Sequence, residues 1–102
     1  MDAGFWVYIA TNRSGSVLYV GVTNDLVRRV SEHRLKTNPR SFTARYNVDR
    51  LVWYETFPTA GDAIAVEKRL KGFVRAKKVE LIEALNPRWM DLSEKWDRGR
   101  MG

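Results

Sequence analysis

Two short apolar runs near the start of the chain have the pattern of paired β-strands. Residues 5–10 and 17–22 are rich in the β-branched and aromatic side chains that suit a pleated surface. Residues 11–16, which lie between them, contain the asparagine, serine and glycine typical of turns. The pattern predicts a β-hairpin. Residues 50–57 have the same strand composition and are followed by Pro58, so we expect a third strand there.

Helices are predicted where apolar residues recur at helical spacing. The predicted helices are Asp25 to about Lys36, Ala60 to roughly Val74, and about Ala76 to Leu85. Prolines follow the first and the third of them, and residues 40–49 are polar and are predicted to be a loop. The order ββαβαα predicts an α/β fold with a small three-stranded antiparallel sheet flanked by helices.

Length and composition limit the function classes. A chain of 102 residues with 44% hydrophobic residues is expected to form one domain, which we place at residues 1–92. Residues 93–102 are expected to be a polar, partly flexible tail. There is no cysteine, no signal-peptide pattern at the start, and no apolar run long enough to span a membrane. We therefore expect a cytoplasmic protein.

The charge is more informative than the composition. Eighteen lysines and arginines against twelve acidic residues give a formal net charge of +6, and residues 68–78 hold six basic side chains and no acidic one. Such clustering favours DNA, or RNA, as a partner, although a well-solvated surface explains it equally well. The candidate contacts to nucleic acid are Arg28, Arg34, Lys36, Lys68, Lys71, Arg75, Lys77 and Lys78.

The hairpin and the first helix carry a recognisable set of polar residues. Each predicted strand holds a tyrosine, Tyr8 or Tyr19, and the second strand contains Gly21. The helix then presents Arg29 and His33 four residues apart on one face. This pattern resembles the GIY-YIG nuclease superfamily, in the small single-domain bacterial type similar to the N-terminal domain of excinuclease.

The half-motifs of that family correspond here to Trp6-Val7-Tyr8 and Tyr19-Val20-Gly21. Trp6 stands where the family has its first glycine. Val22 stands where some relatives have a lysine, which puts in doubt a lysine general base at that position. The resemblance extends from about Phe5 to Leu92, and the ββαβαα order matches the fold that it implies.

The resemblance also implies a catalytic set and a cofactor. A glutamate on the helix after the third strand binds Mg²⁺ or Mn²⁺ in the family, and Glu67 takes that place. An ion pair with Lys71 is the simpler interpretation of Glu67 by itself. The implied catalytic residues are Tyr8, Tyr19, Arg29, His33, Glu67 and Asn86.

Each of these residues also has a purely structural interpretation. The tyrosines are equally suited to packing in strands, His33 to a buried position in the core, and Asn86 to ending the third helix. In the catalytic interpretation, Tyr8 orients the attacking water, and Arg29 stabilises negative charge on the phosphate. Tyr19, His33 and Asn86 then hold the phosphate and the phenol in position.

Three functions are therefore compatible with the sequence. The first is a metal-dependent endonuclease of low sequence specificity, acting on single-stranded, branched or repair-related DNA. The second is a basic module that binds nucleic acid without cleaving it. The third is an interaction domain that uses Trp89, Trp96 and Met101 to bind a partner, including a second copy of the chain.

Overall fold

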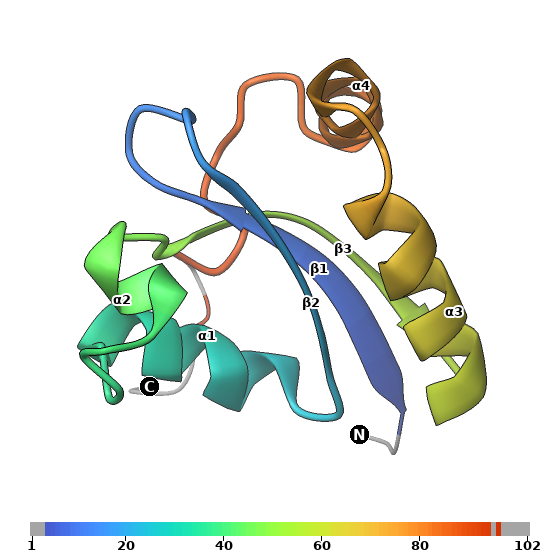
Figure 1. The fold of residues 1–102 in the computed structure, drawn as a ribbon, viewed down its shortest axis with the longest axis horizontal. Coiled ribbons are helices and arrows are strands. Elements are labelled where there is room, and N and C mark those ends of the chain that lie inside the picture. Colours follow the sequence, from blue (N-terminus) through green and yellow to red (C-terminus); the bar gives the residue numbers. More distant parts are fainter. Residues whose placement is uncertain (1–3, 95, 97–102) are drawn as a thin grey trace.

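An antiparallel sheet with the strand order β2-β1-β3 forms the centre of the fold (Figure 1). The computed structural model describes residues 4–94 and residue 96. Its strands are β1 (Phe5–Thr11), β2 (Leu18–Thr23) and β3 (Arg50–Phe57). β1 is the central strand and pairs with both neighbours. The predicted hairpin and the predicted third strand are both present.

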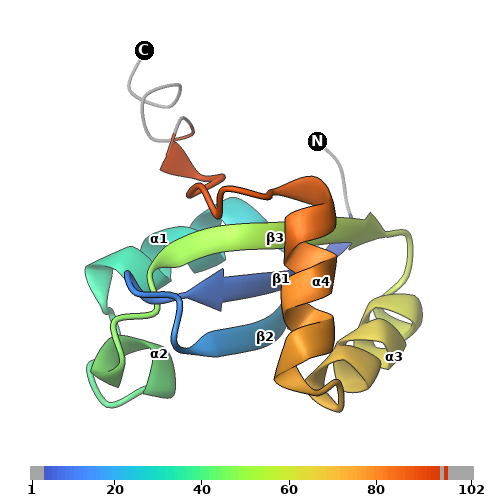
Figure 2. The same ribbon diagram turned by 90° about the horizontal axis from the view of Figure 1, so that it is seen from above.

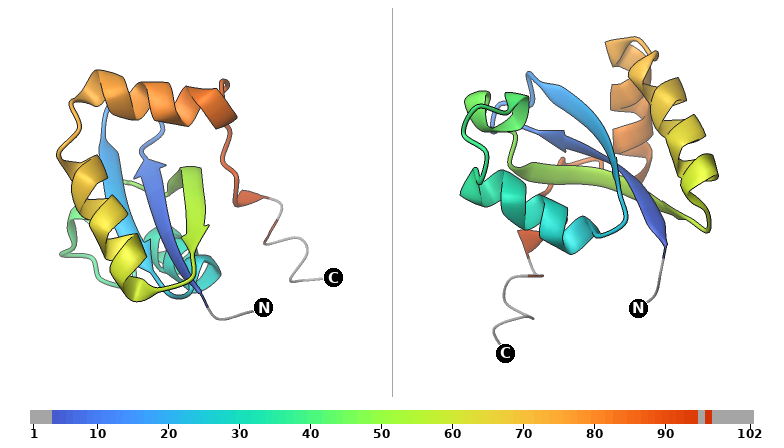
Figure 3. Two further views of the ribbon diagram at one scale, coloured as in Figure 1. Left: turned by 90° about the vertical axis from the view of Figure 1, so that its right-hand side faces the viewer. Right: turned by 60° about the horizontal axis from the view of Figure 1, so that its bottom comes forward.

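Helices cover both faces of this sheet (Figures 2 and 3). α1 (Leu26–Leu35) and α2 (Phe42–Arg45) lie on one face, and α3 (Ala60–Lys71) and α4 (Arg75–Leu85) lie on the other. The predicted fold class, a three-stranded antiparallel sheet flanked by helices, is confirmed within the described residues. The predicted helices start and end within three residues of the observed ones.

The segment 40–49 differs from the prediction because it contains α2 and is not entirely loop. Ser41 caps this helix by accepting a hydrogen bond from the backbone N–H of Ala44. A single turn is too short to show helical periodicity in the sequence, so only its cap was available as a signal. α3 also ends earlier than expected, at Lys71 with Gly72 as its C-cap, instead of at Val74.

Alternation along the strands divides the core into two clusters, one on each face of the sheet. The cluster on the side of α3 and α4 consists of Val7, Ile9, Val20, Val52, Trp53, Ala63, Leu70 and Ile82. The cluster on the side of α1 and α2 consists of Tyr8, Ala10, Leu26, Val30, Val48 and Leu51. Tyr8 therefore belongs to the face of the sheet that α1 covers.

The segment after α4 returns to the sheet and pairs with the start of β3. The Leu92 N–H donates to the Leu51 carbonyl at 2.8 Å, and the Leu51 N–H donates to the Asp91 carboxylate at 3.2 Å. Trp89 and Leu92 pack against the two clusters, as their apolar character predicts. Ser93 is buried, and Trp96 packs edge-on against Tyr54.

The remaining predictions for the tail concern residues 95 and 97–102, including Met101, which lie outside the described residues. The domain boundary at residue 92 accordingly stays a prediction. Within the described part of the chain, no helix is both long enough and apolar enough to cross a membrane.

Candidate active site

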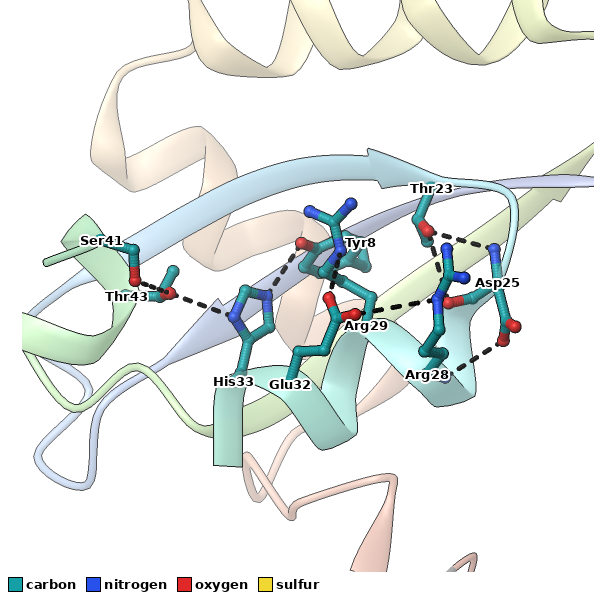
Figure 4. Close-up of polar contacts among 9 residues, drawn as sticks. All are labelled: Tyr8, Thr23, Asp25, Arg28, Arg29, Glu32, His33, Ser41 and Thr43. Carbon is teal, nitrogen blue, oxygen red and sulfur yellow. Dashed lines mark hydrogen bonds and ion pairs between the residues drawn. The ribbon is translucent and has the colours of Figure 1, made fainter. Parts of the chain in front are cut away.

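The two tyrosines and the histidine predicted from the sequence meet between the sheet and α1. Figure 4 shows two of them, Tyr8 and His33, with their polar neighbours. The hydroxyl of Tyr8 is 3.0 Å from Nε2 of His33. The ring centroid of Tyr19 lies 6.2 Å from that of Tyr8 and 5.9 Å from that of His33. Residues from β1, β2 and α1 are thus brought into one cluster.

Gly21 makes this cluster possible. It is directly opposite Tyr8 in the register of β1 and β2, and both residues face α1. A Cβ atom at position 21 would come within 2.5 Å of the Tyr8 hydroxyl oxygen and of the carbon that carries it. Only glycine leaves space for the phenol ring to lie across the β2 backbone. The last glycine of the motif is therefore required by packing against the first tyrosine.

A chain of hydrogen bonds continues from Tyr8 through α1 to α2. Nδ1 of His33 is 3.1 Å from the Thr43 hydroxyl, which is 3.2 Å from the Ser41 hydroxyl. Burial raises the pKa of Tyr8, and burial together with the Arg29 charge lowers the pKa of His33. At neutral pH, Tyr8 is therefore protonated and His33 is neutral, so one ring nitrogen of His33 donates a hydrogen bond and the other accepts one.

This geometry corrects the expected role of Tyr8. Its side chain has 0% relative exposure, so it has no surface from which to orient an attacking water. Tyr19 is only partly buried and lines an open hollow. Tyr8 is on the central strand and Tyr19 is on the edge strand, which explains the difference in exposure.

The hollow beside Tyr19 has a volume of about 310 Å³. It lies where α1, the loop after it and α2 meet the edge strand. Its lining residues are Tyr19, Arg29, Glu32, His33, Thr37, Asn38, Ser41 and Thr43. Three of these, Tyr19, Arg29 and His33, were predicted as site residues. The other lining residues were not, although the Ser41 cap marked this segment in the sequence.

Arg29 is the cation of this hollow. Its Nε lies 3.4 Å from one Glu32 oxygen, and the Arg28 Nε lies 3.8 Å from the other. Among the described residues, the buried Nε of Arg29 has no hydrogen-bond partner. Glu32 thus contacts both arginines, and it lines the hollow. The Arg29 charge opposes the rise in the pKa of Tyr8.

Glu67 does not line this hollow. It lies on α3, which packs on the opposite face of the sheet, and its carboxylate forms an ion pair with Lys71 at 2.7 Å. Its side chain is only 13% exposed. The hydrogen bond from Glu67 raises the pKa of Lys71, and a smaller contribution comes from Tyr19. α3 also contacts β2, the edge strand that carries Tyr19.

No acidic cluster completes a metal site around Glu67. Within the described part of the chain, no group of three or more His, Cys, Asp or Glu side chains is arranged to hold a metal ion. A Mg²⁺ ion is commonly held by one or two carboxylates, with water and substrate phosphate as its other ligands. Glu67 fits such a site as its single protein ligand, provided that the exposed Lys71 moves aside.

Asn86 has a structural position. It is buried at the end of α4, where its amide donates to the Val52 carbonyl at 3.1 Å and to the Met90 carbonyl at 2.9 Å. It also accepts a hydrogen bond from the Met90 N–H. These contacts join α4 and the C-terminal segment to β3. Asn86 does not line the hollow beside Tyr19.

The predicted nucleic-acid contacts are spread over both faces of the sheet. Arg28, Arg34 and Lys36 are on or next to α1, whereas Lys68, Lys71, Arg75, Lys77 and Lys78 are on α3 and α4. Several have protein partners. Arg34 pairs with Asp91 at 3.0 Å, and the Lys77 ammonium lies 5.1 Å from the centre of the Phe73 ring. Arg28, Lys36 and Lys68 are exposed.

The lowered pKa of His33 predicts how stability depends on pH. His33 is buried, and its pKa is below the ordinary value of 6.5, so the unfolded chain binds the proton first. The free energy of unfolding should therefore fall as the pH drops below about 6.5, by at most about 1.4 kcal/mol per pH unit from this group. Urea unfolding between about pH 7.5 and pH 5.5 measures the slope. His33→Gln should make this slope shallower. An equal slope in both proteins would contradict the assignment of the pH dependence to His33.

Comparison with known proteins identifies relatives. The model of the GIY-YIG catalytic domain matches residues 4–80. A UPF0213 protein of Aeromonas salmonicida is 31% identical over 94 residues, which cover 92% of this chain and 68% of that protein. A UPF0213 protein of Haloquadratum walsbyi is 37% identical over 83 residues, covering 81% and 91%. The solution NMR structure of a Bacillus halodurans UPF0213 protein superposes with a TM-score of 0.55 at 27% identity, over 89% of this chain and 95% of that one.

Proposed function

The chain belongs to the GIY-YIG catalytic domain family, and we propose that it is a divalent-metal-dependent endonuclease that hydrolyses phosphodiester bonds in DNA. Membership of the family implies nuclease activity and therefore binding of nucleic acid. The observation that carries the proposal is the hollow in which Tyr19, Arg29 and His33 converge beside the edge strand. The preference for DNA, the low sequence specificity and the metal dependence are our proposals.

Arg29 is the residue that we assign to the phosphate. Its guanidinium lies at the hollow, and its Nε lacks a hydrogen-bond partner among the described residues. A guanidinium offers paired donors to two phosphate oxygens, and it stabilises the negative charge that develops during phosphoryl transfer. Glu32 holds the Arg29 side chain from one side at 3.4 Å. We therefore assign the phosphate to the part of the Arg29 guanidinium that borders the hollow.

Tyr19 is the residue that we assign to the attacking water. It lines the hollow together with Arg29, so a water bonded to its hydroxyl lies near the bound phosphate. His33 and the buried Tyr8 act as positioning residues. Their hydrogen bond and the contact between the His33 and Tyr19 rings fix the phenol of Tyr19 against the sheet.

Glu67 is the residue that would hold the metal, Mg²⁺ or Mn²⁺. A bound divalent ion supplies Lewis-acid stabilisation of a phosphate oxygen and of the leaving oxygen. The half-buried carboxylate is a hard ligand of the type that these ions prefer. In the structure, the ammonium group of Lys71 pairs with the Glu67 carboxylate. Once displaced from that carboxylate, the exposed ammonium group would be available to a phosphate oxygen.

One observation favours the alternative of a non-catalytic nucleic-acid-binding module. The carboxylate of Glu67 is neutralised by Lys71 at 2.7 Å, and a surface of this kind binds an anionic backbone without repelling it. The two functions differ in their response to metal, since a binding module needs none.

Nicking of supercoiled plasmid tests the proposal. The protein should convert plasmid to the open circular form with Mg²⁺ or Mn²⁺, and a chelator should abolish the reaction. Arg29→Ala should lower the rate at saturating DNA about a hundredfold, the magnitude typical of a lost charge-stabilising donor. Arg28→Ala should instead raise the DNA concentration needed for half-maximal rate, because Arg28 is exposed and lies outside the hollow. DNA binding without metal-dependent nicking would contradict the nuclease proposal and favour the non-catalytic nucleic-acid-binding module.

A further inference from the structure

A second hollow lies at the hairpin end of the sheet, where the β1–β2 loop meets α4 and the segment after it. Its volume is about 470 Å³. Among the described residues, four arginines line it, together with neutral side chains such as Thr11, Asn12 and Trp89, and no acidic residue does. We call this cavity the arginine hollow. Its arginines come from four separate segments: Arg13, Arg50, Arg75 and Arg88.

The charges of the arginine hollow are largely uncompensated. In the part of the chain that the structure describes, Arg13, Arg50 and Arg88 form no ion pair, and their guanidinium groups form no hydrogen bond. Like charges gathered around one cavity repel each other and destabilise the fold, whereas a bound anion turns the same arrangement into a favourable one. The distribution of charge is therefore that of a site for an anion.

The wall of the hollow is held in place by contacts of its own. Arg75 donates to the backbone carbonyls of Gly15 and Ser16 and thereby fixes the tip of the β1–β2 loop to α4. The Trp89 ring lies against Gly15, and its Nε1–H donates to Glu83 at 2.7 Å. The site is thus formed before any ligand arrives, which reduces the ordering cost of binding.

The two hollows lie at the same end of the sheet. Thr11 lines the arginine hollow, and its neighbour Ala10 is the register partner of Tyr19, which lines the first hollow. One residue along a strand corresponds to about 3.3 Å. Neighbouring residues on a strand point to opposite faces of the sheet, so a polyanion that occupies the first hollow reaches the second by passing around this end of the sheet.

We propose that the arginine hollow binds a backbone phosphate of the nucleic acid, outside the position that is cleaved; the identity of this ligand rests on the proposed function. A guanidinium group binds phosphate through two parallel N–H···O hydrogen bonds. The volume of the arginine hollow lies in the range of sites that hold a nucleotide-sized group. Contacts of this kind fix the position of the strand without reading its bases. The hollow adds affinity and orientation, and it leaves the sequence preference low.

The test compares two double variants that lose the same charge. Arg13→Gln/Arg88→Gln removes two of the three exposed arginines of the hollow and keeps the third, Arg75, which holds the loop. Arg40→Gln/Arg69→Gln removes two exposed arginines that line neither hollow. Binding of a fluorescein-labelled single-stranded oligonucleotide is measured by anisotropy with chelator present, over a series of salt concentrations.

We expect the hollow variant to bind about tenfold more weakly and the control less than about threefold more weakly. The salt dependence of log K should become shallower by about 0.7 for each lost contact to a single-stranded phosphate. Equal losses in both variants would overturn the proposal. Inorganic phosphate is the second probe. If it binds the wild type but not the hollow variant, while both bind the oligonucleotide equally, the site belongs to a free phosphate compound and the assignment to nucleic acid fails.

A third measurement separates this proposal from the proposed nuclease activity. Bis(4-nitrophenyl) phosphate is too small to occupy both hollows, so its metal-dependent hydrolysis should be the same in wild type and in Arg13→Gln/Arg88→Gln. If the wild type hydrolyses neither this ester nor plasmid, the nuclease proposal fails. The arginine hollow is then still supported by the selective loss of oligonucleotide binding.

Discussion

Gly21→Ala is expected to destabilise the fold by about 3 kcal/mol, at the upper end of the usual cost of overpacking a core. The added methyl group would lie 2.5 Å from the phenol carbon and oxygen of Tyr8, which is fully buried and has no space to retreat. To avoid this steric overlap, either the Tyr8 ring must leave its position or β1 and β2 must separate. Urea unfolding followed by circular dichroism measures the loss, and the hydrogen bond from Tyr8 to His33 should be lost with it.

Gly61→Ala is the matched control for this prediction. Gly61 lies in the first turn of α3, where the nearest atom to an added Cβ, the Thr59 hydroxyl oxygen, is 4.0 Å away. There alanine should stabilise the protein by up to about 1 kcal/mol through its higher helix propensity. In a Tyr8→Ala background, Gly21→Ala should cost much less than in the wild type. A wild-type-like stability of Gly21→Ala itself would contradict the packing argument.

The outline of the fold was predictable from the sequence because its elements are long enough to show their period. β1, β2 and β3 have strand composition, and α1 carries Leu26, Val30 and His33 on one face. α2 was missed because one turn of helix has no period, and its only local signal is the cap at Ser41. Two of the five missed residues of the first hollow, Ser41 and Thr43, come from α2 and its cap.

The different exposures of the two tyrosines were not predictable, for a different physical reason. Alternation along the strands fixes which face a side chain takes, but exposure on that face also depends on the order of the strands. β1 is central, so Tyr8 is covered on both sides, whereas β2 is an edge strand, so Tyr19 reaches solvent. Strand order is a tertiary property that neither tyrosine reveals in its local sequence.

The arginine hollow shows the same limit for charge. The sequence indicated an excess of basic residues, and it selected Arg75 from a local cluster of charges. Arg13, Arg50 and Arg88 were not selected, and they meet only because β3 pairs with β1 and α4 packs across the end of these strands. The local density of charge in the sequence therefore identifies the basic helices but not the arginine hollow.

Glu67→Gln is expected to reduce metal-dependent nicking about a thousandfold or more, because a lost metal ligand removes several kcal/mol of transition-state stabilisation. The amide keeps the size of the side chain and loses the charge that binds Mg²⁺. The ion pair with Lys71 is also lost, but Lys71 is 54% exposed, so the free energy of unfolding should change by less than about 1 kcal/mol. Plasmid nicking and urea unfolding of the same preparation measure the two effects.

Lys71→Met separates a metal ligand from a simple ion pair. If Glu67 holds the metal, Lys71 competes with the ion for the same carboxylate oxygens at 2.7 Å. Removing the ammonium should then lower the Mg²⁺ concentration that gives half-maximal nicking. If Glu67 only pairs with Lys71, the two variants should resemble each other in activity, and neither should change the metal dependence. Full activity of Glu67→Gln would contradict the assignment of Glu67 as the metal ligand. The charge stabilisation beside Arg29 and Tyr19 would then have to come from a different group.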